Sequence, residues 1–598
     1  MSQLTQLLFS LYGHRWDFYK VLDKLEKIMR QAAEVSDDAF SSCASSDSKS
    51  ACEYDSSWIN DQKTVGMVLY VDLFSGNLKE LINKIPYFLE LGVNYIHLMP
   101  LFDCPKDNND GGYAISSYRK VQPSLGTIED LKEVAKAFHK ENIRLVLDFV
   151  FNHTSDEHEW ALKARKGDPK YKDYYYIIKN KNEVDEWNRT LREIFPTFRR
   201  GSFTWQKDMK AWVWTTFNSF QWDLNYSNPE TFLAMCEEML SIANLGVDVL
   251  RLDALAFVWK EKGTACESLP KAHTLIKAFQ YVAKIACPRL IFKSEAIVHP
   301  NQVVQYIHED ECKLSYNPLQ MALFWSTIAT RDTRLLTLSL KRNWKIPEGT
   351  AWVNYIRCHD DIGWTFRDED AAEFGINGYM HRQFLNKFFT GRFPGTYACG
   401  EPFQLNPATG DCRICGSMAS LAGLEQAENL HNPLLRKMAV GRIKMMFATL
   451  LALPGIPLIY FNDERAVFND YSYRNVKGKK DDSRWVHRIK TDWEKPFEHK
   501  SQKEIFDFVK KAISIRKKEK NFGENDFYIY DNQNPQTFIF KRGMVHVAVN
   551  FTDQPAPYKI DAWSPESKDL LSGKKYWNYS VQMLEPYEVR WLKEIIKK

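Results

Sequence analysis

The sequence lacks an excess of charge of either sign. Its 598 residues include 80 Lys and Arg against 76 Asp and Glu, a formal net charge of +4. Nucleic acids and anionic membrane surfaces are bound through a large positive excess that this chain does not have. A basic tract at residues 477–480 is followed at once by Asp481 and Asp482, which indicates a solvated loop. We therefore expect no nucleic-acid partner and no membrane partner.

A long uninterrupted hydrophobic run is also missing. The longest apolar stretch, residues 445–461, contains Pro454, Gly455 and Pro457. These residues predict the end of a helix, a turn and then a strand, not a membrane span. Residues 1–12 have no basic segment before their apolar residues and no small-residue cleavage site, so they do not resemble a signal peptide.

The eleven cysteines form no disulfide framework, because their number is odd and their spacing is irregular. Such usage is typical of a reducing compartment, and we expect a cytoplasmic protein. Cys412 and Cys415 form a lone C-x-x-C pair with no second pair at zinc spacing. We predict neither a metal ion nor a redox role for this pair.

Aromatic residues, by contrast, are abundant: they make up 14% of the chain and include 18 Trp. Such side chains fill cores, and they also line sites that stack on sugar rings. The hydrophobic share of 44% and the charged share of 26% are ordinary for a globular protein. A chain of this length is expected to form several structural units.

Short β-branched and apolar runs alternate with helical stripes from Met67 onward. The stripe at residues 78–89 and the capping signal at Thr127 predict two of the helices. This alternation is typical of βαβ units and a parallel sheet. The predicted strands are residues 67–71, 95–99, 144–150, 247–253, 290–293, 314–316, 352–356 and 455–460. Eight strands are enough to close a (β/α)8 TIM barrel, which is an α/β fold.

Composition and periodicity also divide the chain. The predicted units are a helical N-terminal domain (1–60), a catalytic barrel (61–151, 229–361 and 428–518), an insertion after the third strand (152–228), an insertion on the acceptor side after the seventh strand (362–427) and a C-terminal β-sandwich domain (519–598). Within the first unit, the Ser-rich stretch 41–50 is expected to be a loop. In the last unit, residues 527–530, 537–540 and 545–549 alternate with a period of two, which predicts antiparallel strands.

Polar residues follow the predicted barrel strands. They are Asp148 with Asn152 and His153, Arg251 with Asp253, Glu295, and the run His359, Asp360 and Asp361. A parallel barrel brings these strand ends onto one face, where active sites of such barrels lie. Cleavage of an acetal by a retaining mechanism needs a carboxylic acid and a nucleophilic carboxylate. We predict Asp253, kept ionised by Arg251, as the nucleophile, Glu295 as the acid and Asp360 as the residue that holds sugar hydroxyls.

Four segments at these positions resemble the motifs of the α-amylase superfamily, glycoside hydrolase family 13. They are LDFVFNH at 147–153, VLRLDA at 249–254, KSEA at 293–296 and RCHDD at 357–361. Within that superfamily, three further segments resemble the amylosucrases: GYAISSY at 112–118, WTTFNSFQWDLNY at 214–226 and SEAIVHP at 294–300. The likeness extends over nearly the whole chain, including the helical N-terminal segment.

This resemblance implies glucosyl transfer from sucrose to the non-reducing end of an α-1,4-glucan, with release of fructose. The implied partners are sucrose and an α-glucan, either glycogen or a maltooligosaccharide, and the implied assembly is a monomer or homodimer. No cofactor and no metal ion are expected. The residues that match the glucosyl site are Asp110, Tyr113, His153, Phe217, Arg251, His359, Asp360 and Arg484. Asp110 and Arg484 are implied to pair and close the pocket, and Asp361 and Arg413 to face the fructosyl or acceptor unit.

The chain departs from the superfamily after the eighth strand, where the usual Gly-Asp-Glu is replaced by Asn462, Asp463 and Glu464. Loss of the glycine is expected to affect the loop that leads to Arg484. Two alternatives remain open from the sequence. One is a sucrose hydrolase, in which water accepts the glucosyl unit, and the other is a catalytically inactive glucan-binding barrel. An isomaltulose synthase is disfavoured, because no Arg-Leu-Asp-Arg motif occurs near residues 362–427.

Overall fold

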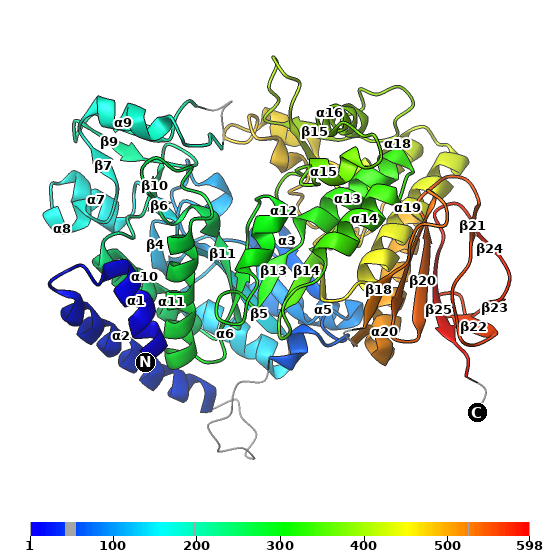
Figure 1. The fold of residues 1–598 in the computed structure, drawn as a ribbon, viewed down its shortest axis with the longest axis horizontal. Helices are drawn as coiled ribbons and strands as arrows, with labels where there is room; N and C mark the ends of the chain where they lie inside the picture. Colours follow the sequence, from blue (N-terminus) through cyan, green and yellow to red (C-terminus); the bar gives the residue numbers. More distant parts are fainter. Residues whose placement is uncertain (1, 42–55, 195–198, 524–525, 597–598) are drawn as a thin grey trace.

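The centre of the molecule is a closed barrel of eight parallel strands (Figure 1). The computed structural model describes residues 2–41, 56–194, 199–523 and 526–596. The barrel strands are β1 (Gly66–Leu69), β2 (Tyr95–Leu98), β5 (Arg144–Val150), β11 (Val249–Asp253), β12 (Ile291–Ser294), β13 (Leu314–Tyr316), β14 (Ala351–Tyr355) and β17 (Ile456–Tyr460). Strands that follow one another in this series are neighbours in the barrel, and β17 pairs with β1. The predicted fold and all eight predicted strands are confirmed.

Helices surround the barrel. They include α6 (Ile128–Lys140), α10 (Pro229–Ala243), α11 (Pro270–Ala286), α13 (Pro318–Thr330), α14 (Arg334–Asn343), α19 (Pro433–Ala452) and α20 (Lys500–Lys518). The predicted capping signal at the start of α6 is confirmed: the Thr127 side chain accepts from the Asp130 amide, and the Asp130 carboxylate accepts from the Thr127 amide. Among the described residues, no helix has both the length and the apolar character needed to cross a membrane.

The helical stripe at residues 78–89 is split into α4 (Leu78–Ile82) and α5 (Ile85–Leu91). Pro86 lies in the first turn of α5. In a continuous helix its ring would clash with the carbonyl of Ile82, four residues earlier, and it has no amide hydrogen to donate to that carbonyl. The first helix therefore ends at Ile82 and a second one begins.

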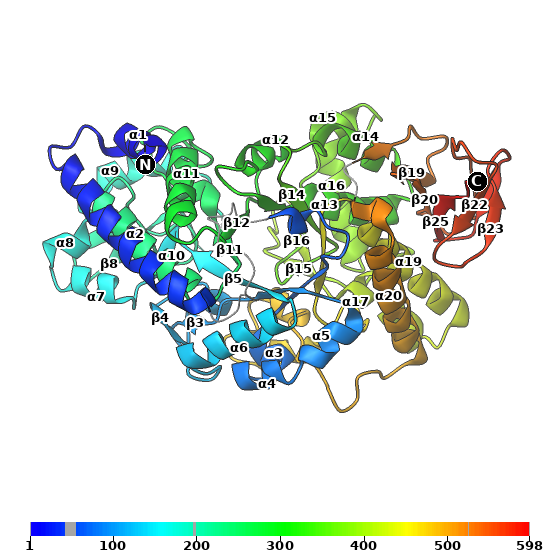
Figure 2. The same cartoon turned by 90° about the horizontal axis from the view of Figure 1, so that it is seen from below.

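Two N-terminal helices, α1 (Ser2–Tyr12) and α2 (Phe18–Ser41), pack against α10 and α11 on the outside of the barrel (Figure 2). The Tyr12 hydroxyl donates to the carbonyl of Tyr226 at 2.9 Å. The side-chain amide of Asn244 donates to the carbonyl of Ala32, also at 2.9 Å. Of the Ser-rich stretch predicted as a loop, only Ser41 is described, as the last residue of α2; residues 42–50 lie outside the described residues.

The insertion after β5 contains regular structure that its sequence did not predict. Its elements are β6 (His153–Ser155), α7 (Glu159–Arg165), α8 (Pro169–Lys172), β7 (Ile177–Ile178), α9 (Lys181–Asn188), β8 (Phe203–Gln206), β9 (Ala211–Trp214) and β10 (Gln221–Asp223). Strands β7, β9 and β8 form a small sheet over a cluster that includes Val184, Phe203 and Trp214. Elements this short are held by side-chain packing, which local periodicity does not reveal.

The insertion after β14 is also structured. It consists of α15 (Asp368–Ala372), α16 (Gly378–Phe389), β15 (Glu401–Phe403), β16 (Arg413–Cys415), α17 (Met418–Leu421) and α18 (Leu424–Asn429). The antiparallel pair of β15 and β16 places Phe403 opposite Arg413. This pairing brings the predicted acceptor residue Arg413 back toward the end of β14.

The C-terminal residues form an antiparallel six-stranded sheet, at the orange and red end of the chain in Figure 1. Its strands are β18 (Phe527–Ile529), β19 (Thr537–Arg542), β20 (Val545–Asn550), β25 (Val589–Glu594), β22 (Glu566–Asp569) and β23 (Lys575–Trp577). A second sheet, β21 (Ala556–Tyr558) with β24 (Gln582–Leu584), packs on it through Ile539, Tyr558 and Leu584. The predicted C-terminal antiparallel β region is confirmed.

Candidate active site

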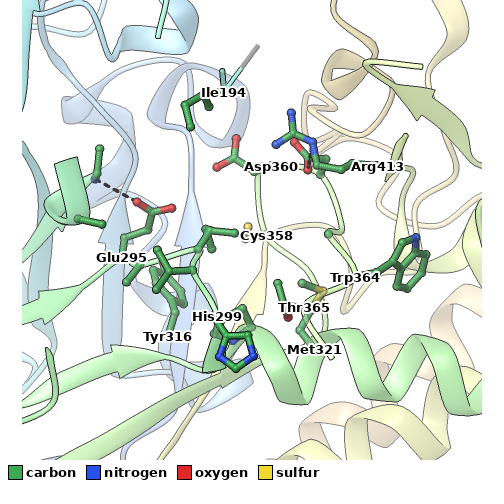
Figure 3. A pocket seen from close by; sticks show the side chains of 18 of the residues that line it. Ile194, Glu295, His299, Tyr316, Met321, Cys358, Asp360, Trp364, Thr365 and Arg413 are labelled. Atoms are coloured by element: carbon green, nitrogen blue, oxygen red, sulfur yellow. Dashed lines mark hydrogen bonds and ion pairs between the residues drawn. The ribbon is translucent and has the colours of Figure 1, made fainter. Parts of the chain in front are cut away.

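A cavity of about 750 Å³ opens at the carboxyl ends of the barrel strands. All twelve side chains predicted for the site line it: Asp110, Tyr113, His153, Phe217, Arg251, Asp253, Glu295, His359, Asp360, Asp361, Arg413 and Arg484. Figure 3 shows Glu295, Asp360 and Arg413 around this cavity, with Tyr316 and His299 below Glu295. The barrel therefore brings residues that are up to 374 positions apart into contact, as in the pair of Asp110 and Arg484.

Arg251 is the cation at the base of the site. It lies two residues before Asp253 on β11, so both side chains point to the same face of the strand. Its guanidinium is 2% exposed and lies 2.9 Å from Asp253 and 3.7 Å from Glu295. It also pairs with Asp148, the residue opposite it on β5. One buried cation thus holds three carboxylates that would otherwise repel one another.

The carboxyl groups of Asp253 and Glu295 both lie beside Arg251. The sequence predicts that Arg251 keeps Asp253 ionised, but burial raises the pKa of Asp253 well above its usual range, and Arg251 offsets only part of this. Burial also raises the pKa of Glu295. Both carboxyl groups therefore hold a proton up to a higher pH than isolated carboxylic acids do. The shorter distance from Arg251 to Asp253 favours the negative charge on Asp253 and the proton on Glu295.

The backbone after β11 helps to orient Glu295. Ala254 has a φ of 52°, in the left-handed region that residues other than Gly rarely adopt. In this conformation its amide donates to the Glu295 carboxylate at 3.1 Å, the bond drawn as a dashed line in Figure 3. Strain of this kind is common at functional sites. The hydrogen bond from Ala254 to Glu295 thus ties the predicted acid to the residue that directly follows the predicted nucleophile, Asp253.

Asp360 has a different electrostatic environment from the other two carboxylates. It lies 3.1 Å from His359, 3.4 Å from Arg484 and 3.5 Å from Arg488. Burial alone would raise the pKa of Asp360, but these three groups outweigh burial and hold that pKa well below its usual range. Asp360 is therefore a fixed anion that accepts hydrogen bonds, which suits a residue that holds sugar hydroxyl groups.

The pocket-closing pair implied by the resemblance is present. Arg484 donates to Asp110 at 2.9 Å and to Asp482 at 2.8 Å. Gln221 lies beside it, with its side-chain amide 3.4 Å from Asp110 and 3.1 Å from His153. The ring of Phe217 lies 5.3 Å from that of His153. This end of the cavity is closed by side chains from three loops that are distant in sequence.

The wall formed by the insertion at 362–427 is more exposed. Arg413 lies 3.2 Å from Asp361 and has a side chain that is 34% exposed. Its guanidinium lies 4.9 Å from the ring centre of Phe403, and that of Arg484 lies 5.0 Å from the same ring. Phe403 therefore connects the predicted acceptor residue with the pocket-closing pair through two cation–π contacts.

The structure revises one predicted residue, Asp148, and adds three that were not predicted. Asp148 was predicted as part of the site face, but it lies inside the barrel, where it bonds to His97 at 3.0 Å and pairs with Arg251. Gln221 lies in the segment 214–226 that resembles the amylosucrases, and Arg488 lies four residues after Arg484. No local sequence pattern marks either residue as part of the site. Phe403 had no signal at all, because its role depends on the pairing of β15 with β16.

Asn462 preserves the backbone conformation expected of the missing glycine. Its φ is 73°, in the left-handed region, and Asn tolerates this region better than most residues. Its side-chain amide donates to the carbonyl of Ile489 at 3.0 Å and accepts from the Thr491 hydroxyl at 3.0 Å. The substitution thus ties the loop after β17 to the segment that follows Arg484.

The catalytic-domain model of the alpha-amylase family matches residues 39–361. This span is more than half of the chain and contains all the predicted catalytic residues. The chain belongs to the alpha-amylase family. The barrel, the position of the cavity and the four motifs agree with this assignment.

Curated members of the alpha-amylase family that are similar to this chain carry several names. The trehalose synthase/amylase TreS of Mycobacterium tuberculosis is 29% identical over 398 residues, which are 65% of this chain and 59% of that protein. The chain therefore matches about three fifths of the length of this relative. The glucosylglycerate phosphorylase of Escherichia coli is 23% identical, with 89% of this chain and 92% of that protein covered.

Solved structures share the fold. Trehalulose synthase MutB superposes with a TM-score of 0.67 at 18% identity, covering 90% of this chain and 100% of that chain. The sucrose 6F-phosphate phosphorylase of Thermoanaerobacter thermosaccharolyticum gives a TM-score of 0.63 at 18% identity, covering 86% and 98%. At these identities the likeness establishes the architecture of this family member, and its substrates are a separate question.

Proposed function

We propose that the protein is a retaining glucosyltransferase of the amylosucrase type. It cleaves sucrose, releases fructose and transfers glucose to the non-reducing end of an α-1,4-glucan. The observation that carries this proposal is the arrangement of Asp253 and Glu295 around Arg251 in a cavity closed by Arg484 and Asp110. A retaining mechanism needs an ionised nucleophile and a protonated general acid, and the shorter distance from Arg251 to Asp253 than to Glu295 supports this assignment.

In the first step, the Asp253 carboxylate attacks the anomeric carbon of the glucosyl unit. The bond from that carbon to the fructosyl oxygen breaks, and Glu295 gives its proton to this oxygen, so neutral fructose leaves. The products are a covalent β-glucosyl ester on Asp253 and an ionised Glu295. Asp360, held as an anion by His359, Arg484 and Arg488, accepts hydrogen bonds from the sugar hydroxyls as the ring flattens.

In the second step, Glu295 acts as a base. It takes the proton of an acceptor hydroxyl at the non-reducing end of the glucan, and that oxygen attacks the anomeric carbon. The ester bond to Asp253 breaks, and both carboxyl groups return to their starting protonation states. The energy of the sucrose linkage is carried into the new glycosidic bond, so the proposed reaction needs no cofactor.

The closed end of the cavity supports a donor that presents a single terminal glucosyl unit. Arg484 is held by Asp110 and Asp482 at 2.9 and 2.8 Å, respectively, at the end of the cavity behind the proposed position of that unit. Sucrose has such a terminus. Similar proteins are named trehalose synthase and sucrose 6F-phosphate phosphorylase, and trehalose and sucrose both present a terminal glucosyl unit.

Incubation of the purified protein with sucrose tests the proposal. With added glycogen, we expect fructose in large excess over free glucose, together with growth of an iodine-staining polymer. Equal amounts of glucose and fructose would indicate a sucrose hydrolase. No release of either sugar, with glycogen still bound, would indicate the inactive glucan-binding barrel.

A parallel incubation with an α-glucan or a maltooligosaccharide, without sucrose, tests for the activity named for a relative, a trehalose synthase. Formation of trehalose, without turnover of sucrose, would contradict the proposal. As further parts of the proposal, sucrose and an α-glucan are the partners, and the enzyme works in the cytoplasm.

A further inference from the structure

Three consecutive residues on the wall of the cavity carry ligand atoms for a metal ion. Cys358, His359 and Asp360 follow β14, and all three line the cavity. Their sulfur, imidazole nitrogen and carboxylate oxygen atoms all lie within 4.8 Å of one another. No sequence pattern indicates such a group, because the spacing of the three residues matches none of the usual metal motifs.

The three residues of this cluster differ in how far they are exposed to the cavity. Cys358 is a free, half-buried thiol, and the Asp360 side chain is 33% exposed. The Nδ1 atom of His359 is buried and has no hydrogen-bond partner among the described residues. Figure 3 shows Cys358 and Asp360 near each other among the side chains that line the cavity.

The ligand types select the kind of ion. Calcium and magnesium prefer oxygen ligands, whereas a set of thiolate, imidazole and carboxylate suits zinc and the softer cadmium. With metal–ligand bonds of about 2.0 to 2.3 Å, ligand atoms in a tetrahedral zinc site lie roughly 3.3 to 3.8 Å apart. Small side-chain movements therefore suffice to close the present cluster around an ion, and water completes the fourth position.

We propose that Cys358, His359 and Asp360 form an inhibitory site for a thiophilic divalent cation, Zn²⁺ or Cd²⁺. Binding forms a sulfur–metal bond and releases the thiol proton to solvent, without any change of oxidation state. The bound ion occupies the Asp360 carboxylate and its side of the cavity. The metal site itself is independent of the reaction, whereas its inhibitory effect rests on the proposed function.

Cadmium titration tests the site without any reference to activity. A cadmium–thiolate bond gives an ultraviolet charge-transfer band, and we expect this band to saturate at one equivalent in the wild-type protein. Cys358→Ser removes the sulfur ligand at nearly constant volume and should abolish that saturable band. Cys399→Ser is the matched control, because Cys399 is also a half-buried free thiol, in the insertion at 362–427. A band that persists in Cys358→Ser would overturn the site.

Zinc inhibition tests the consequence. Zn²⁺ should compete with sucrose, and Cys358→Ser should raise the inhibition constant by at least about tenfold, with each variant compared with its own metal-free rate. The Cys399→Ser protein should respond like the wild type. Inhibition that is equal in all three proteins, or that does not compete with sucrose, would contradict the proposal. Failure of sucrose turnover would leave the cadmium result standing, so the two proposals are tested separately.

Discussion

The two walls of the cavity are built differently. The barrel wall consists of Arg251, Asp253, Glu295, His359 and Asp360 at the strand ends, and its cation Arg251 is only 2% exposed. The insertion wall consists of Trp364, Thr365, Phe366, Arg367 and Arg413, where Arg413 is 34% and Arg367 21% exposed. Each charge on the first wall is held by several partners, including Asp360, whose side chain is 33% exposed. On the second wall, the charges of Arg413 and Arg367 lie at the edge of solvent.

We infer from this difference that the barrel wall carries out the bond-breaking step and that the insertion wall selects the acceptor. Buried, multiply held charges keep their positions while a bond breaks, which is what electrostatic stabilisation of a transition state requires. Half-exposed side chains can be replaced or repacked at a small cost in free energy. We therefore expect changes in the barrel wall to abolish turnover, and changes in the insertion wall to alter what is made.

The largest effect is expected from Asp253→Asn on the barrel wall. Loss of the nucleophile should lower kcat for sucrose by at least about 10⁴-fold, measured as fructose release. Asp208→Asn is the control, because Asp208 is 50% exposed in the insertion at 152–228 and pairs only with Arg165 among the described contacts. Substantial fructose release by a folded Asp253→Asn protein would remove the assigned nucleophile.

The next effect is expected from Arg484→Ala, which opens the closed end of the cavity. Its removal leaves Asp110, Asp360 and Asp482 without a shared cation. Breaking such buried pairs costs about 3 to 5 kcal/mol, so kcat/KM for sucrose should fall by roughly 10² to 10⁴-fold. Arg474→Ala should have no such effect, because Arg474 is 56% exposed on the same loop. Equal kcat/KM in both variants would contradict closure by Arg484.

The pH dependence of kcat/KM tests whether Glu295, and not Asp253, is the general acid of the barrel wall. Because burial raises the pKa of Glu295, its acid form should persist above the usual range, and kcat/KM for sucrose should then fall about tenfold per pH unit above that raised pKa. Glucosyl fluoride needs no proton for its leaving group, so its kcat/KM should lack this alkaline decline. Parallel profiles for the two donors would show that Glu295 is not the general acid.

On the insertion wall, Arg413→Ala should change the products more than the rate. The half-exposed pair with Asp361 is worth about 1 kcal/mol, so sucrose cleavage should fall by less than about tenfold. The ratio of free glucose to fructose should rise, because water competes better with a weakened acceptor. Lys387→Ala, exposed in the same insertion, is the control. A loss of cleavage as large as that of Asp253→Asn would erase the distinction between the walls.

The smallest effect is expected at Asn462, which supports the loop behind the closed end. In Asn462→Ala, the residue must still adopt the left-handed backbone conformation, but its side chain loses the hydrogen bonds to Ile489 and Thr491. It should lower the free energy of unfolding by about 1 to 2 kcal/mol, and Asn462→Gly by less, since Gly adopts this conformation without strain. Thermal unfolding of the two variants and the wild type measures these changes in stability. If the alanine variant is as stable as the wild type, Asn462 does not replace the glycine in this way.

Local pattern was sufficient for the barrel and its strand ends. Each strand is a short apolar run buried on both faces, such as Tyr95–Leu98, and β-strand alternation places Arg251 and Asp253 on one face. The break before α5 was missed because the stripe of apolar residues continues across Pro86. The contacts of Gln221, Arg488 and Phe403 were missed because each partner lies on a different loop.

The sequence by itself determined the order of the strands and which carboxylates lie at their ends, because both depend on residues a few positions apart. Only the tertiary structure decided how these groups share charge. Burial raises the pKa of Asp253 despite the adjacent Arg251, and two arginines together with the hydrogen-bonded His359 imidazole hold Asp360 ionised. Such effects depend on solvent exclusion and on distances between chain segments, and neither is encoded in any single stretch of the sequence.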